Sequence, residues 1–221
     1  MGKTKAEKEQ MAQSASLNKF RVITYIDGFN LYFGLREQAW RRYMWLDLPA
    51  LSRSLLRFDQ TLLLTKYFTS RVSGNPGKEQ RQSAWLDAIA TLPDLSIYWG
   101  KFQADRKECK KCHNISFVPQ EKKTDVNIAT ELLCDAHSDA FDTAIIISGD
   151  ADLVPPIAAI RRLFPQKKVV VAFPPCRYSA ELALTANASM RIFESNLRKS
   201  RLPESVTLAS GTVVTRPPKW A

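Results

Sequence analysis

Long apolar runs are missing from this 221-residue chain, and none approaches the roughly 20 residues that would cross a bilayer. The N-terminal segment also lacks the charged and then apolar layout of a secretory signal, so we expect a cytoplasmic protein with no membrane partner. Histidine occurs only twice, as His113 in a polar loop and His137 at a predicted helix end, and GxSxG is absent. These absences argue against histidine acid–base catalysis and against a serine nucleophile.

Cysteine is also scarce, with four residues in the chain. Cys134 and Cys176 stand in apolar surroundings and are expected to be buried. Cys109 and Cys112, in CKKCH, have the spacing of half a zinc site, but a closed site needs four ligands and only His113 is near. Structural zinc at this pair and a loop with two free thiols are both open interpretations.

Positive charge is in excess, with a net charge of +10 and a pI of about 9.6. Such a balance favours a polyanionic partner, most often nucleic acid. Residues 1–20 and 191–221 carry more than half of the excess, so solubilising ends explain part of it. The body of the chain is only mildly basic.

Apolar segments of strand length alternate with amphipathic segments of helix length. Strands are predicted at 21–27, 61–70, 96–102, 141–150, 167–173 and 190–193, and helices at 47–56, 78–91, 123–137, 152–164 and 179–187. Near-continuous apolar strands separated by helices indicate an α/β fold with a mainly parallel central sheet covered on both faces. We expect one domain at 20–195, a disordered basic arm at 1–19 and a flexible C-terminal tail at 196–221.

Aspartates stand where ligands bind in such sheets, outside the carboxyl ends of the strands. Asp27 ends the first strand, Asp150 ends the fourth with Asp152 close behind, and Asp125 lies in the first turn of a helix. Converging carboxylates repel one another unless a cation is present. Oxygen ligands without a nearby histidine favour Mg²⁺ or Mn²⁺.

Each acid also has a simpler interpretation. Asp27 suits an Asx-turn, Asp125 suits the positive end of its helix dipole, and Asp150 and Asp152 suit a turn and a helix cap. Taken singly, these alternatives are about as good as a metal site. Taken together, acids at matching strand ends favour the metal site.

Four motifs, in order, carry a resemblance to a known family: YIDGFNLY, EKKTDVNIATELL, SGDADLVPPI and KKVVVAFPP. Over residues 20–195 the chain resembles the NYN family of PIN-like nucleases. The resemblance implies a Rossmann-like, PIN-like three-layer sandwich and metal-dependent cleavage of RNA. It also implies that Asp27, Asp125 and Asp150 bind the metal, that Asp152 supports them, and that Asn30 orients the first acid, a water or the substrate.

Four residues within these motifs are expected to contact substrate: Asn30, Lys122, Lys123 and Ser148. Arg71, before the turn GNPGKE, is expected to contact a phosphate. For the two lysines, a solvated charged loop is the simpler alternative. The segment AWRRYMW (39–45) fits either base stacking on its aromatic residues or a partly buried lid.

The sequence thus predicts a Mg²⁺- or Mn²⁺-dependent endoribonuclease acting on single-stranded RNA. A non-catalytic RNA-binding module and a small-molecule phosphohydrolase are the alternatives, and a homodimer is one candidate for the oligomeric state.

Overall fold

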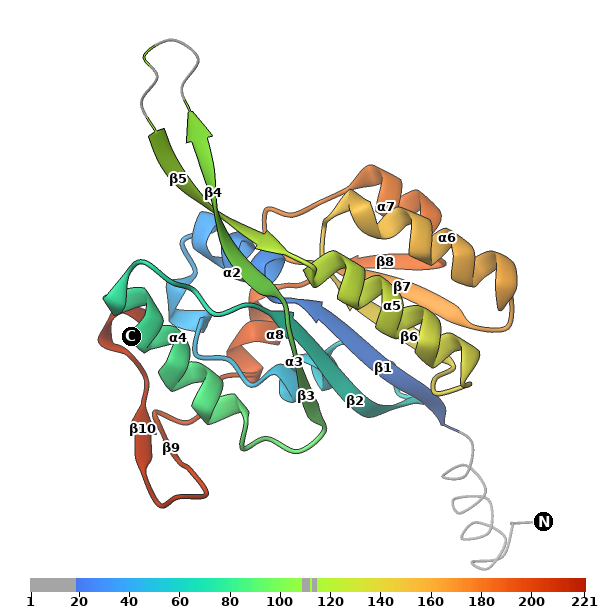
Figure 1. Cartoon of the computed structure of the whole chain (residues 1–221). Coiled ribbons are helices and arrows are strands. Elements are labelled where there is room, and N and C mark those ends of the chain that lie inside the picture. Colours follow the sequence, from blue (N-terminus) through green and yellow to red (C-terminus); the bar gives the residue numbers. More distant parts are fainter. Residues whose placement is uncertain (1–18, 109–111, 113–114) are drawn as a thin grey trace, which may run out of the picture.

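A six-stranded sheet forms the centre of the molecule (Figure 1). The computed structural model describes residues 19–108, 112 and 115–221, with the backbone alone for 102–108 and 115–121. Across the sheet the strands are β3 (Leu95–Trp99), β2 (Gln60–Thr69), β1 (Phe20–Asp27), β6 (Thr143–Ile147), β7 (Lys168–Phe173) and β8 (Ala188–Arg191). Every neighbouring pair is parallel, which confirms the predicted α/β class.

Helices cover both faces of this sheet and complete the three layers. One face carries α2 (Gly28–Glu37), α3 (Leu48–Ser54), α4 (Pro76–Ile89) and α8 (Glu194–Lys199). The other carries α5 (Thr124–His137), α6 (Val154–Leu163) and α7 (Ala180–Thr185). The predicted order of strands and helices is therefore the observed one for most of the chain.

Side chains alternate between the two layers of core along each central strand. In β6, Ala144 and Ile146 pack with α5 and α6, whereas Ile145 and Ile147 pack on the opposite face. Because both faces are covered, β6 reads as a continuous apolar run. The strand stops at Ile147, earlier than predicted, because Ser148 begins the turn into the 3₁₀ helix η2 (Ala151–Leu153).

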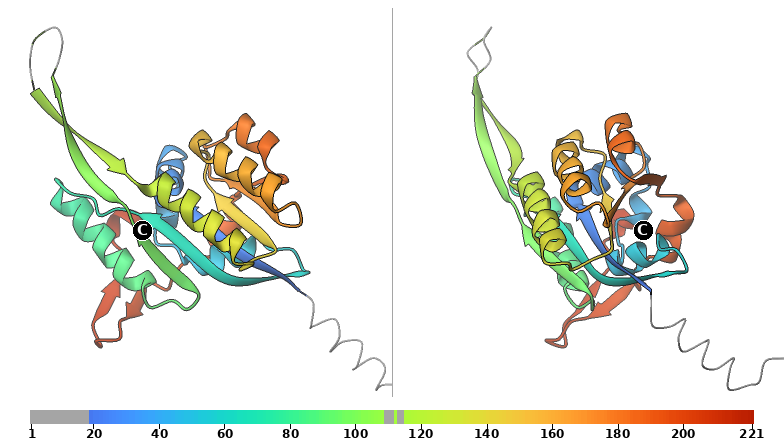
Figure 2. Two further views of the ribbon diagram at one scale, coloured as in Figure 1. Left: turned by 45° about the vertical axis from the view of Figure 1, so that its right-hand side comes forward. Right: turned by 90° about the vertical axis from the view of Figure 1, so that its right-hand side faces the viewer.

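A two-stranded arm replaces the end of the strand predicted at 96–102. β3 ends at Trp99, and after Gly100 the chain enters β4 (Lys101–Glu108), which pairs antiparallel with β5 (Ile115–Lys122). The arm projects from the body in every view (Figures 1 and 2). It leads directly into α5, so it joins the sheet edge to the helix that carries Asp125.

The C-terminal segment differs from the flexible tail predicted at 196–221. It completes α8 and forms a hairpin of β9 (Ser205–Thr207) and β10 (Val213–Thr215). Trp220 is 8% exposed and packs into the core beside α2 and α4. The indole Nε1 of Trp45 donates a hydrogen bond to the Pro203 carbonyl at 2.6 Å. Buried aromatic contacts fix a segment whose prolines and glycine suggested a loose end.

Further predictions have mixed outcomes. Cys134 and Cys176 are exposed, because Cys134 lies on the outer side of α5 and Cys176 lies in a loop, so their predicted burial is wrong. In the 39–45 segment, Tyr43, Met44 and Trp45 are buried, as expected for the alternative of a partly buried lid.

The disordered N-terminal segment predicted at 1–19 lies outside the described residues except for Lys19. No helix in the described part of the chain is long and apolar enough to span a membrane.

Candidate metal centre

Asp27 ends β1 at the point where the chain folds back into α2. Its Oδ1 accepts a hydrogen bond from the Asn30 backbone N–H at 3.0 Å and so caps the helix. Its Oδ2 accepts from the Ser148 hydroxyl at 2.9 Å. The carboxyl group is buried, and burial raises its pKa, as does the charge of Asp150, while the two hydrogen bonds oppose the shift. The capping role and a metal-binding role are therefore compatible in one side chain.

Asp150 stands on the neighbouring strand end, because β1 pairs with β6 so that Ile26 lies beside Ile147. The turn after β6 is held by two hydrogen bonds, from Asp150 N–H to the Ser148 hydroxyl at 3.0 Å and from Gly149 N–H to Asn30 Oδ1 at 2.9 Å. The chain leaves β1 and β6 in opposite directions along the sheet, as at the ligand-binding switch points of other α/β folds.

Gly149 is required by close packing at this turn. A Cβ on Gly149 would lie 2.8 Å from the backbone oxygen of Arg177, which is nearer than van der Waals contact allows. Any larger residue would force either this turn, which carries Asp150, or the Arg177 backbone to shift.

Asp125 reaches the same edge from the first turn of α5. The helix begins after Lys123, whose φ of 76° is left-handed. Burial and, after it, the charges of Asp27, Asp150 and Asp152 together raise the pKa of Asp125 to about 6. This carboxyl group therefore experiences the repulsion that a shared cation would relieve.

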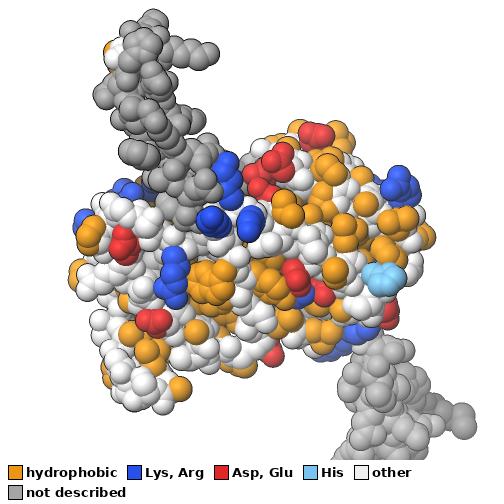
Figure 3. Space-filling view, viewed as in Figure 1, with side chains coloured by type: hydrophobic (Ala, Val, Ile, Leu, Met, Phe, Trp, Pro, Cys, Tyr) orange, Lys and Arg blue, Asp and Glu red, His pale blue; other side chains and the backbone are white. Residues whose placement is uncertain are grey.

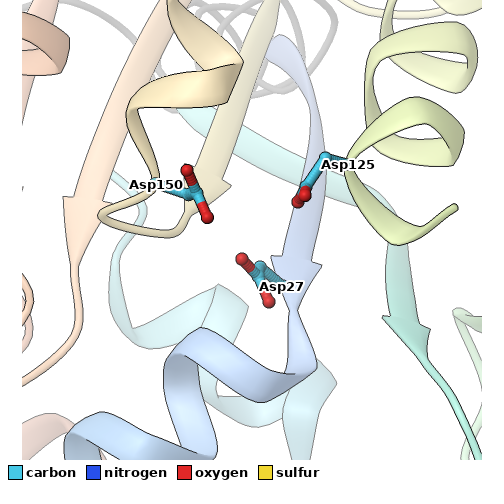
Figure 4. Close-up of side chains that lie close together, drawn as sticks. All are labelled: Asp27, Asp125 and Asp150. Carbon is cyan, nitrogen blue, oxygen red and sulfur yellow. The ribbon is translucent and has the colours of Figure 1, made fainter. Parts of the chain in front are cut away.

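The three carboxylates meet in one small cavity. Ligand oxygens of Asp27, Asp125 and Asp150 all lie within 4.8 Å of one another, and their side chains point toward a common centre (Figure 4). The cavity has a volume of about 190 Å³ and is also lined by Phe29, Asn30, Phe33 and Arg177. Hard oxygen donors at this spacing, from rigid elements, fit a divalent cation such as Mg²⁺ or Mn²⁺.

Asp152 takes a different position from the other acids. Its side chain is exposed and does not belong to the cluster of three. Its backbone N–H donates to Asp150 Oδ1 at 3.0 Å, so Asp150 also acts as the cap of η2. Asp152 thus acts on the site through its charge and its backbone.

The predicted substrate residues divide into two groups. Ser148 is fully buried and its hydroxyl group binds Asp27 and Asp150, so it supports the acids and does not face a substrate. Arg71, Lys122 and Lys123 are exposed near the sheet edge that carries the acids. The Arg71 guanidinium lies over the Trp99 ring, 4.9 Å from its centroid. Basic side chains gather at the foot of the arm beside an acidic group (Figure 3).

The predicted cysteine pair remains a prediction. Cys112 is exposed with a free thiol, and Cys109 lies outside the described residues.

Sequence reasoning missed Phe29, Phe33 and Arg177 as lining residues. The helical spacing of Phe29 and Phe33 was a usable signal, but α2 was not predicted as a helix. Arg177 follows β7, its guanidinium pairs with Glu37, and its buried Nε has no hydrogen-bond partner in the described structure. Nothing in the local sequence points to its position.

The fold and this cluster define an α/β domain with an acidic edge, where three aspartates could hold a metal ion. The family model of the NYN domain matches residues 21–192, so the chain belongs to the NYN family.

Two individual proteins are also similar. The chain is 24% identical over 188 residues to a Pseudomonas putida protein named 6-hydroxy-3-succinoylpyridine 3-monooxygenase, an alignment that covers 68% of this chain and 59% of that protein. A crystal structure of a protein of unknown function from Vibrio parahaemolyticus superposes with a TM-score of 0.53 at 18% identity, covering 84% of this chain and 98% of that one. This second likeness supports the fold alone.

Proposed function

We propose that this protein is a divalent-cation-dependent endoribonuclease that hydrolyses phosphodiester bonds of single-stranded RNA. The observation that supports it most directly is the meeting of Asp27, Asp125 and Asp150 within 4.8 Å at the carboxyl edge of an NYN-family sheet. Asp27 is buried and Asp125 and Asp150 are partly buried, so a bound cation would stabilise their negative charges and relieve the repulsion between them.

In this proposal Asp27, Asp125 and Asp150 hold Mg²⁺ or Mn²⁺. Such a cation lowers the pKa of a bound water and stabilises charge on a phosphodiester under attack. Ser148 and Asn30 keep Asp27 and the Gly149 turn in place through their hydrogen bonds.

Basic side chains around the cluster provide the contact with RNA. Arg71, Lys122 and Lys123 stand exposed near the acidic edge, where they can meet phosphates on either side of the reacting one. Arg177 lines the metal cavity itself, so its positive charge stands where a phosphate group would lie. Asp152 is proposed to assist by its charge beside Asp150.

The test is a nuclease assay on single-stranded RNA with EDTA, Mg²⁺ or Mn²⁺. We expect wild-type protein to cleave only with a divalent cation, and Asp150→Asn to lose the activity. Asp87→Asn, an exposed acid on α4, is the control for a surface charge change and should retain it. Equal cleavage by Asp150→Asn and wild type would contradict the assignment.

The same assay separates the alternatives. Salt-sensitive RNA binding without turnover under any divalent cation would identify a non-catalytic RNA-binding module. Hydrolysis of small phosphate esters in preference to RNA would identify a phosphohydrolase. Cytoplasmic location, a homodimer and zinc at Cys109 and Cys112 remain further proposals from the sequence. The monooxygenase name of the Pseudomonas protein brings no activity to this chain at 24% identity.

A further inference from the structure

A second and larger cavity lies next to the metal centre. Its volume is about 420 Å³, in the range of pockets for small organic groups. Its walls come from α2, α4, β2 and the C-terminal segment, and they include the aromatic residues Phe29, Tyr32, Phe33, Tyr67, Trp85 and Trp220. Such a concentration of rings around an open space is suited to a flat, aromatic ligand.

The two cavities share a wall. Phe29 and Phe33 line both of them, and their ring centroids lie 6.0 Å apart on one side of α2. Asp27 caps the same helix. If a phosphate of an RNA strand lies at the acidic cluster, the adjoining nucleotides of that strand can therefore reach the aromatic cavity.

Positive side chains complete the second cavity. Arg36, Lys78 and Arg81 belong to its lining, and the Arg36 guanidinium lies over the Phe33 ring, 4.8 Å from the centroid. Aromatic walls with cations beside them match the two parts of a nucleotide, a base that stacks and a phosphate that is anionic. A purely aliphatic occupant would leave the cations without a role.

We propose that this cavity is a nucleobase pocket, which takes one unpaired base of the RNA strand whose backbone crosses the metal centre. The inference rests on the proposed function, because it assigns a second subsite to the same substrate. A base inserted here cannot remain in a duplex, so the pocket selects single-stranded RNA. Stacking on rings tolerates every base, so we expect weak sequence preference.

The experiment measures binding, separately from cleavage. Short single-stranded RNAs, each with one abasic position, are titrated against the full chain in EDTA with fluorescence anisotropy as the readout. We expect one abasic position to weaken wild-type binding by roughly tenfold, the scale of one lost base–aromatic stack. The other positions should have much smaller effects.

Two variants alter the pocket. Val72→Trp fills the cavity from a partly exposed loop residue in its lining, and Tyr32→Leu removes one ring while keeping an apolar side chain. In both, intact RNA should bind more weakly, and the difference between intact and position-specific abasic RNA should shrink. Val213→Trp, on an exposed site of β10, is the matched control and should keep the wild-type difference.

The outcomes distinguish the pocket from the nuclease. A position-specific effect that disappears in Val72→Trp supports the pocket even if no cleavage occurs with any metal. Cleavage by wild type without any position-specific effect, or an effect unchanged in both variants, overturns the pocket and leaves the nuclease proposal intact. Absence of RNA binding overturns both, and would reassign the cavity to a small aromatic ligand or a protein segment. Circular dichroism confirms that each variant is folded.

Discussion

The hydroxyl group of Ser148 donates a hydrogen bond to Asp27 Oδ2 at 2.9 Å, across the junction between β1 and β6. The hydroxyl oxygen of Ser148 also accepts a hydrogen bond from the Asp150 backbone N–H at 3.0 Å. One small, fully buried side chain thus joins two acids of the cluster. The site is organised before any ligand arrives, because these contacts lie within the protein.

Replacing Ser148 with alanine should destabilise the protein. The change leaves a buried carboxylate oxygen without its donor, which costs about 1–3 kcal/mol. In a chain of this size each kcal/mol corresponds to roughly 2–4 °C in Tm. Thermal unfolding followed by circular dichroism measures the effect, and Ser73→Ala, at an exposed loop position, is the control. An unchanged Tm would show that the hydrogen bond carries no net stability.

The metal-free protein should lose stability as the pH rises from about 4 to about 6. The pKa of Asp125 is raised to about 6 in the folded state from an ordinary value near 3.8, so the unfolded chain releases this proton at lower pH. Ionisation is therefore disfavoured in the folded state, and the loss accumulates between the two values. Thermal unfolding in EDTA across this range measures it.

A variant and a metal titration test the same linkage. Asp125→Asn removes the titrating group, so its Tm should fall less over that pH range than the Tm of wild type. Mg²⁺ or Mn²⁺ should raise the Tm of wild type more above pH 6, where Asp125 is ionised, than below it, and should affect Asp125→Asn less. Equal pH profiles for the two proteins would remove Asp125 as the source.

Lys123 allows charge and backbone strain to be separated. Its φ of 76° is unfavourable for a residue with a Cβ, so Lys123→Gly should stabilise the fold by about 0.5–1 kcal/mol relative to Lys123→Ala. Both variants lose the same positive charge and should weaken RNA binding equally, reducing the salt slope by about one. Urea unfolding and RNA titrations at several salt concentrations provide the measurements. Unequal RNA affinities would show that Lys123 acts through the start of α5.

Trp220→Ala should destabilise the protein by about 3 kcal/mol, since it empties a position in the core cluster. A loosely attached tail would instead give no change. Lys219→Ala, the exposed neighbour, controls for changes at the end of the chain. Denaturant unfolding monitored by circular dichroism distinguishes the two results.

The meeting of the three acids was more predictable from the sequence than their surroundings. Asp27 and Asp150 could be placed because each follows an apolar strand, and parallel strands bring their carboxyl ends to one edge. The sequence could not show that Ser148 faces inward, because a hydroxyl beside a turn suits solvent or protein equally well.

The aromatic cavity could not be predicted from local patterns. Its walls combine α2, α4 and β2 with Trp220, and only tertiary packing brings these segments together. The tail was misjudged for the same reason: prolines and a glycine describe local backbone preference, whereas the burial of Trp220 depends on distant partners. Cys134 shows the converse: its neighbours in sequence are apolar, but its side chain lies on the exposed side of α5.

The two legs of the β4–β5 arm are fastened together where they leave the body. Gly100 N–H donates to the Thr69 carbonyl at 2.8 Å, and a Cβ on Gly100 would lie 2.6 Å from Thr124 Oγ1. The arm therefore leaves and rejoins the body at one closely packed junction, next to the start of α5. We therefore expect the length of the arm beyond this junction to change without displacing Asp125.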